Sequence, residues 1–367
     1  MSISCSTIGC MKEAKPRRIL VINPGATSTK ISVFDDETEM FQTNIEHDSA
    51  QLSCFARIID QKDFRKNLVL GELAKNNVSL SSFDAVCGRG GLLKHIQSGT
   101  YRINDAVIRD VMNPPYGEHA SNLGVILARE IADEIGCPAF FSDPVSTDEL
   151  CDLARVSGFA PMQRESFFHA LNQKGKAREA AAQLQRPYEE LNLIVVHMGG
   201  GVSIAAHCKG KVVDVFNVKD DGSFSMDRGG GLPVNSVINL CFSGKTKQEV
   251  KRLLGSEAGV FSYLGTRDFR DVEKLMKAGD GKATLVFKAM AYQHAKDIGA
   301  MAAVLGFKVD AVVLTGGIAN CRSFCDEIRS YVKELAPVLV LPGEVEMLSL
   351  AQGTLRVLRG GECMTYI

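Results

Sequence analysis

The sequence predicts an α/β fold made of two related halves. Residues 19–25 read Ile-Leu-Val-Ile-Asn-Pro-Gly, and residues 193–199 read Leu-Ile-Val-Val-His-Met-Gly. In each stretch four apolar residues and one polar residue lead into a glycine-rich turn, and a second apolar run follows. Strands alternate with helices after both copies, which is typical of α/β architecture. Because each half opens with antiparallel strands, a simple doubly wound parallel sheet is not expected.

The individual elements follow from the apolar runs and the residues that interrupt them. A hairpin is expected around the turn at 24–29, and a three-stranded meander over 193–216. A helix over 123–135 is stopped by Gly136 and Pro138. The other expected strands are 85–87, 139–141, 311–314 and 338–341, and the other expected helices are 171–184, 284–306 and 347–359.

Composition excludes several classes of function. Hydrophobic residues make up 45% of the chain and charged residues 23%, as in a globular protein. The net charge of −1 gives no reason to expect nucleic acid or an anionic membrane as a partner, and no apolar stretch approaches the ~20 residues of a membrane span. The 11 cysteines are scattered singly, which favours reduced thiols and a cytoplasmic location. Residues 1–17 lack the apolar core of a signal peptide and are expected to form an N-terminal extension.

Three strand-to-glycine turns are candidate phosphate sites, at 23–29, 197–203 and 315–320. Glycine lets the backbone approach a phosphate closely, and a tight turn directs several amides toward one anion. Neither the Walker motif nor a dinucleotide-binding fingerprint is present. One such turn alone would be interpreted as an ordinary hairpin. Three such turns are present, and two of them lie at matching positions of an internal repeat. This arrangement favours binding of a polyphosphate from both sides.

Two arginines and two histidines are candidates for stabilising a transferred phosphoryl group, whose charge spreads over its oxygens. Arg89 follows a buried strand and is flanked by glycines, and Arg228 precedes three glycines. Glycine exposes an arginine without supporting it, which favours function over packing. His169 follows two phenylalanines, and His119 follows Tyr-Gly-Glu. Either histidine could equally be a satisfied core residue.

Acidic residues complete the candidate set. Asp143 ends an apolar strand and precedes a proline, which is a usual place for a functional acid and also for an Asx turn. Glu344 and Glu346 lie at the start of the last helix, where they could simply favour its dipole. No His/Cys cluster has zinc spacing, so only a phosphate-bound Mg²⁺ is implied.

Five segments in the right order resemble the acetate/butyrate kinases, the acetokinase family of the actin-like ATPase superfamily, with the butyrate kinases most similar. Residues 22–30 and 196–203 are similar to the first and second phosphate motifs of that family, and 224–233, 315–320 and 342–353 also resemble family segments. The resemblance covers about residues 18–360. It implies two actin-like ATPase (ribonuclease H-like) domains with mixed sheets and an interdomain cleft. The implied units are 18–165, 166–345 and a terminal helix at 346–367 that packs back on the first domain.

The resemblance also implies roles for the candidate residues. Asn23 and Glu346 would position Mg²⁺, Arg89 and Arg228 would bind the acyl carboxylate and the moving phosphoryl group, and His169 would stabilise that group. Asp143 would orient an arginine or the substrate, and His119 lies where acetate kinases carry a His-Asn-Pro-type segment. The residues that would bind ATP or ADP are Gly25, Thr27, Ser28, Thr29, Lys30, His197, Gly199, Gly200, Gly201, Gly316, Gly317 and Asn320.

This chain departs from the family at three points. Ala26 stands where relatives have serine, which removes one hydroxyl from the first turn. The metal-linked acid could be Glu344 in place of Glu346. The segment around His119 lacks the prolines of acetate kinases.

The implied activity is transfer of the γ-phosphoryl group of ATP to the carboxylate of a short-chain fatty acid, with butyrate favoured, giving acyl phosphate and ADP. A carboxylate is ionised at pH 7, so direct in-line transfer needs no general base. Kinases of acetate, propionate or branched-chain acids are alternatives within the class, and an actin- or chaperone-like ATPase is an alternative outside it. A sugar-kinase-like repressor is disfavoured because no helix-turn-helix segment precedes residue 19. The family suggests a homodimer or higher homo-oligomer.

Overall fold

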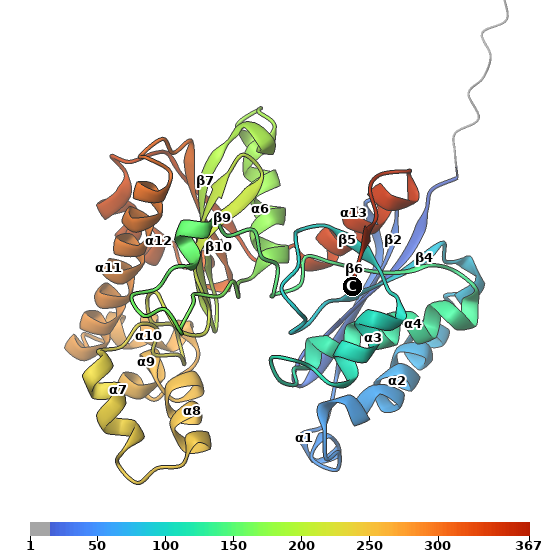
Figure 1. Ribbon diagram of the computed structural model, residues 1–367, viewed down its shortest axis with the longest axis horizontal. Helices are drawn as coiled ribbons and strands as arrows, with labels where there is room; N and C mark the ends of the chain where they lie inside the picture. The colour runs from blue at the N-terminus through green and yellow to red at the C-terminus, as the bar shows by residue number, and fades with distance from the viewer. Residues whose placement is uncertain (1–14) are drawn as a thin grey trace, which may run out of the picture.

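A computed structural model describes residues 15–367, which form two halves, each built on a mixed β-sheet (Figure 1). The first sheet has seven strands in the order β12-β5-β6-β4-β1-β2-β3. Its strands are β1 (Arg18–Pro24), β2 (Ser28–Asp35), β3 (Thr38–Glu46), β4 (Ala85–Arg89), β5 (Thr100–Arg102), β6 (Ala139–Ser142) and β12 (Met364–Thr365). Strands β1, β2 and β3 form an antiparallel meander, and β4 and then β6 continue the sheet parallel to β1.

The second sheet repeats the same beginning. Its order is β11-β10-β7-β8-β9, with β7 (Asn192–Met198), β8 (Val202–Cys208), β9 (Lys211–Phe216), β10 (Ala311–Gly316) and β11 (Val338–Pro342). Strands β7, β8 and β9 form the antiparallel meander, while β10 and β11 run parallel to β7. The predicted duplication is therefore present as two meanders, each continued by parallel strands.

The first sheet is covered by helices on both faces. The helices from this half of the sequence are α1 (Ser49–Leu52), α2 (Lys62–Lys75), α3 (Asp105–Met112) and α4 (Leu123–Ile135). The last of these ends as predicted at Gly136, which adopts the left-handed conformation that glycine tolerates. Val107, Val125 and Leu127 of these helices are fully buried in the core between the helices and one face of the sheet.

The other face of the first sheet is covered by a helix from the end of the chain. Helix α13 (Glu346–Leu358) packs against β1, β4 and β6 and is drawn in red among the blue and teal strands of Figure 1. Its Met347, Leu350 and Leu355 share a core cluster with Ile19 and Phe140. A segment that follows the second sheet in sequence thus completes the first domain in space.

The second sheet also lies between helices. Helices α5 (Asp152–Arg155) and α6 (Ala170–Gln183) precede it, and the alanines of α6 pack on β7 and β10. Helices α11 (Gly281–Val304) and α12 (Arg322–Val332) pack against it within a separate core cluster. Between β9 and α11 lie four shorter helices, α7 (Val234–Cys241), α8 (Lys247–Ser256), α9 (Gly259–Leu264) and α10 (Phe269–Lys277). Within residues 15–367, no helix is long and apolar enough to cross a membrane.

Candidate active site

The first glycine turn joins β1 to β2. The Gly25 amide donates to the Ser28 carbonyl at 2.8 Å, and the His47 amide donates to the Thr27 carbonyl at 2.8 Å. The predicted ligand residues Gly25, Thr27 and Ser28 therefore form a closed turn beside Lys30 on β2. Thr29 differs from the expectation for its side chain. It is fully buried, and its hydroxyl bonds to His47 Nε2 at 2.8 Å, so this hydroxyl serves the turn rather than a ligand.

A buried arginine supports this turn from behind. Arg65, on α2, donates to the carbonyls of Gly25 (2.8 Å), Ser28 (3.0 Å) and Ala26 (3.1 Å). Its side chain is fully buried, and burial lowers the pKa of Arg65 only to about 10, so it stays charged at neutral pH. The carbonyl and the following amide of a peptide point in opposite directions. Amides that follow the bound carbonyls therefore point away from Arg65.

Arg65 was not among the predicted residues, although the sequence carries a signal for it. Arg65, Val69 and Leu73 are spaced four residues apart and form the buried face of α2. An arginine in that row implies a polar partner inside the protein. No described acidic side chain forms an ion pair with it, and its side-chain partners are the neutral Gln61 and Thr29.

The second and third turns pack against each other. The second joins β7 to β8, and a Cβ on Gly201 would lie 2.5 Å from Val218 Cγ2 and 3.5 Å from Arg228 Cζ. The third follows β10, where Gly316 has φ +88° and a Cβ would lie 2.4 Å from the Met198 carbonyl oxygen. Gly316 therefore needs to be glycine, because a side chain there would push the third turn away from the end of β7, whereas a side chain on Gly201 would displace Val218.

A cavity of about 600 Å³ opens beside these two turns. Gly199, Gly200 and Gly317 line it, together with residues of α9 and α10 that include Phe261 and Phe269. Asn320, predicted with Gly317 to bind ATP or ADP, does not line this cavity. Its side chain donates to the Gly317 carbonyl at 2.9 Å, so the structure gives it a turn-closing contact.

The β1 end of the first glycine turn is where three predicted residues meet: Arg89, Asn23 and Glu346. Arg89 Nη2 lies 2.8 Å from Glu346 Oε1, and Arg89 Nη1 donates to Asn23 Oδ1 at 3.3 Å. The Asn23 side chain in turn donates to Glu346 Oε2 at 2.9 Å. These residues come from β4, β1 and the first turn of α13. The structure thus assembles one cation, one amide and one acid from distant parts of the sequence.

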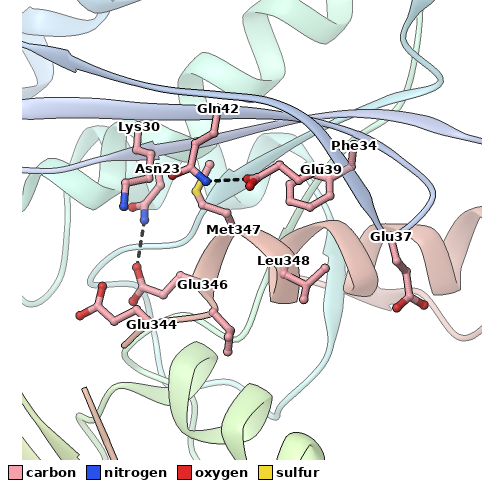
Figure 2. A pocket seen from close by; sticks show the side chains of 11 residues that line it. Asn23, Lys30, Phe34, Glu37, Glu39, Gln42, Glu344, Glu346, Met347 and Leu348 are labelled. Carbon is pink, nitrogen blue, oxygen red and sulfur yellow. Dashed lines mark hydrogen bonds between the residues drawn. The ribbon is translucent and has the colours of Figure 1, made fainter. Parts of the chain in front are cut away.

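A cavity of about 230 Å³ lies beside this cluster. In Figure 2, Asn23 and Lys30 face Glu344 and Glu346 across it. Burial and the neighbouring Glu346 carboxylate raise the pKa of Glu344. Two acids that repel each other beside an amide oxygen form a donor set that suits a hard cation. No group of three or more metal-binding side chains is found within the described chain. The residues therefore fit Mg²⁺ held mainly by phosphate oxygens and water.

His169 and His197 stack face to face between the two halves of the site. Their ring centroids are 3.7 Å apart and the planes differ by 11°. Burial comes first and the charge of Arg89 second in lowering the pKa of His197 to about 3, and burial also holds the pKa of His169 well below its usual value. Both rings are therefore neutral at pH 7. Asn172 lies 2.8 Å from His197 Nδ1 and accepts from the Val345 amide at 3.0 Å, which connects the second turn to the segment before α13.

His119 and Arg228 belong to the same region. Burial, then the charges of Arg89 and Arg228, lower the pKa of His119. The same two arginines act on His169, so both predicted histidines lie within electrostatic reach of both predicted arginines. Arg228 is oriented by donating to the Val218 carbonyl at 2.9 Å.

Asp143 has a different arrangement from the one expected. Its Oδ1 accepts from the Ser98 hydroxyl at 2.7 Å and the Gly99 amide at 2.9 Å, and it is buried with φ +38°. Within residues 15–367, no arginine is hydrogen-bonded to this carboxylate. The acid closes a loop before β5, and its role in orienting an arginine or the substrate stays a prediction.

Known proteins resemble this chain in sequence and in fold. Residues 163–338 match the model of the Acetokinase family. An acetate kinase from Porphyromonas gingivalis has a similar structure, with a TM-score of 0.78 at 19% identity, covering 93% of this chain and 100% of that one. A propionate kinase from Francisella tularensis subsp. tularensis SCHU S4 gives 0.74 at 19% identity, covering 92% and 98%. An acetate kinase from Entamoeba histolytica gives 0.75 at 17%, covering 92% and 98%.

These structural likenesses establish the fold. The chain has an α/β fold with two mixed sheets like that of the acetate and propionate kinases, which agrees with the predicted fold class. The region matched by the family model includes the second and third turns, His169 and Arg228. The roles of the individual site residues remain predictions.

Proposed function

We propose that this protein is an ATP-dependent carboxylate kinase that phosphorylates a short-chain fatty acid, with butyrate favoured, and gives acyl phosphate and ADP. The observation that carries the proposal is the meeting of Arg89, Asn23 and Glu346 at the first turn, with Arg228, His119 and His169 in electrostatic reach. The match to the Acetokinase family over residues 163–338 supports it.

The proposed chemistry needs positioning and charge neutralisation. A short-chain carboxylate is already ionised at neutral pH, and attack on the γ-phosphorus in line with the leaving ADP forms the new O–P bond as the old one breaks. Arg89 and Arg228 would bind the carboxylate and the equatorial oxygens. His169, being neutral, would donate a hydrogen bond without adding charge. Mg²⁺, held by phosphate oxygens near Asn23 and Glu346, would neutralise phosphate charge when bound.

The decisive experiment measures ADP release with and without butyrate and traps the product with hydroxylamine. Butyrate-dependent ADP release with hydroxamate formation is expected. ADP release that does not respond to any acid would instead favour an actin- or chaperone-like ATPase.

Direct transfer makes a separate stereochemical prediction. ATP that is chiral at the γ-phosphorus should give acyl phosphate with inverted configuration, because one in-line displacement inverts the centre. Retention would indicate a phosphoenzyme and would contradict the direct mechanism.

Acetate or propionate is the alternative acceptor, because acetate and propionate kinases are among the similar structures. One methylene changes binding by only ~1–3 kcal/mol, so the acceptor must be measured. Comparison of kcat/KM over acids of two to six carbons, branched ones included, identifies it.

We also propose that the protein is cytoplasmic and forms a homodimer or higher homo-oligomer. Light scattering of the purified protein tests the oligomeric state.

A further inference from the structure

Behind His169 lies a chain of buried side chains joined by hydrogen bonds. Tyr188 Oη is 2.8 Å from His207 Nδ1, and His207 Nε2 is 3.0 Å from Gln173 Oε1. Gln173 Nε2 is 2.8 Å from Ser203 Oγ, which is 2.8 Å from His169 Nδ1. The four residues behind His169 are each at most 4% exposed. They come from a 3₁₀ turn (Tyr188–Glu190), from α6 and from β8.

The backbone carbonyl oxygen of Ser203 fixes which group donates and which accepts in each of these hydrogen bonds. The backbone carbonyl of Ser203 can only accept, and Gln173 Nε2 lies 3.0 Å from it. The NH₂ end of the Gln173 amide must therefore face Ser203, with its second hydrogen directed to Ser203 Oγ. The amide oxygen then faces His207, so His207 Nε2 carries a hydrogen.

The remaining bonds follow at both ends. Burial holds the pKa of His207 well below its usual value, so the ring is neutral and its Nδ1 accepts from the Tyr188 hydroxyl. At the other end Ser203 Oγ accepts from Gln173 and gives its single hydrogen to His169 Nδ1. A neutral His169 then carries its proton on Nε2.

We propose that Tyr188, His207, Gln173 and Ser203 form a relay that sets the tautomer of His169, so that Nε2–H is presented as a hydrogen-bond donor. The relay residues are positioning residues that act through His169. In the kinase reaction, which rests on the proposed function, this donor would meet an oxygen of the transferred phosphoryl group. The opposite tautomer would present a lone pair to an anion and repel it.

Two features of the surroundings of His169 make its tautomer matter for binding an anion. The stacked His197 ring restrains His169 from rotating, so the ring cannot exchange its two nitrogens to compensate. Burial, then His197 and the charges of Arg89 and Arg228, lower the pKa of His169, which leaves the neutral donor, rather than imidazolium, as its form at pH 7. A fixed neutral donor adds hydrogen bonding at the site while the arginines supply the charge.

The tautomer can be measured directly on the full-length protein. In protein labelled with ¹⁵N-histidine, the two ring nitrogens of a neutral imidazole give different shifts, and comparison with His169→Asn assigns the signals. The expected result is a neutral His169 protonated at Nε2 at pH 7. Protonation at Nδ1, or an imidazolium, would overturn the relay. This measurement needs no turnover, so it separates failure of the relay from failure of the proposed kinase activity.

Variants test the positioning effect. Ser203→Ala should abolish the preference for Nε2–H and lower kcat about tenfold, a fraction of the loss when a donor is removed outright, with the KM for the acid unchanged. Tyr188→Phe, at the far end, should lower kcat roughly two- to threefold, because it weakens only the cooperative polarisation of the chain. Ser243→Ala and Tyr331→Phe, two exposed sites, are the matched controls and should behave as wild type. Unchanged tautomer and kcat in a folded Ser203→Ala protein would refute the proposal.

Discussion

Arg89 and Glu346 form an ion pair with 2.8 Å between Nη2 and Oε1, and Asn23 bonds to both of them. The acid is 6% exposed and lies in the first turn of α13, whereas the arginine is the last residue of β4. Each carboxylate oxygen of Glu346 already has one donor, which holds the group in one orientation. The candidate site is therefore organised around an acid whose position depends on the last long helix of the chain.

We expect Glu346→Gln to raise the Mg²⁺ concentration needed for half-maximal activity and to lower kcat at least about tenfold. An amide is a weaker ligand for Mg²⁺ than a carboxylate, and Arg89 loses its partner. Titration of Mg²⁺ at fixed ATP provides the measurement. Glu72→Gln, at a partly exposed acid of α2 that pairs with Lys75 and lies outside the site, is the control. An unchanged Mg²⁺ dependence would exclude Glu346 and leave Glu344 as the metal-linked acid.

Removal of Arg228 should affect the chemical step. We predict that Arg228→Ala lowers kcat by ~10²-fold or more, as when one charge-stabilising donor is lost, while circular dichroism shows an intact fold. Arg270→Ala removes an arginine whose side chain is 82% exposed and should leave kcat unchanged. Wild-type turnover of Arg228→Ala would remove this residue from the mechanism.

Substitution of the buried arginine should weaken nucleotide binding. Lysine keeps the charge of Arg65 but cannot reach all the carbonyls that the guanidinium binds. We expect Arg65→Lys to lower the free energy of unfolding by about 2 kcal/mol, since each lost hydrogen bond costs ~1 kcal/mol. Because the first turn loosens, the KM for ATP should rise several-fold while the KM for the acid stays constant. Arg129→Lys, paired on the surface with Asp133, is the control, and an unchanged KM for ATP would limit Arg65 to a structural role.

Stability should fall on acidification because of buried histidines. His294 is fully buried, and burial lowers its pKa to about 4, whereas the unfolded value is ~6.5. The unfolded chain therefore binds the proton first, so stability is complete above about pH 6.5 and declines until about pH 4. His294 alone should contribute a loss of ~3 kcal/mol over that window. Urea unfolding at several pH values should show a shallower decline for His294→Leu, and an equal decline would contradict this origin.

The sequence was informative where local chemistry determines structure. Apolar runs ending in glycine predicted β1, β7 and β10, and Gly136 marked the end of α4. Strand β3 was not predicted, because its side chains are exposed or only partly buried and carry little apolar pattern. Most residues of α7 and α8 are exposed as well, although their apolar residues keep a helical spacing, as at Val250, Leu253 and Leu254.

The site was less accessible to sequence reasoning, because its contacts join distant segments. Asn23 and Glu346 are 323 positions apart, and only the family resemblance placed them together. Asp143 was expected to orient an arginine or the substrate, but its partners Ser98 and Gly99 lie in a loop whose path no local pattern reveals. The relay behind His169 depends on four side chains whose packing only three dimensions bring into line.

The position of α13 also constrains how the chain is made. Ile19, Val21 and Phe140 are buried against residues of this helix, so during synthesis they stay uncovered until residues 346–358 have left the ribosome. The first domain therefore cannot mature as an independent unit ahead of the second, although domains usually fold in order of their synthesis. A ribosome stalled shortly before residue 346 would hold a nascent chain with an exposed apolar sheet face, the kind of surface that chaperones bind.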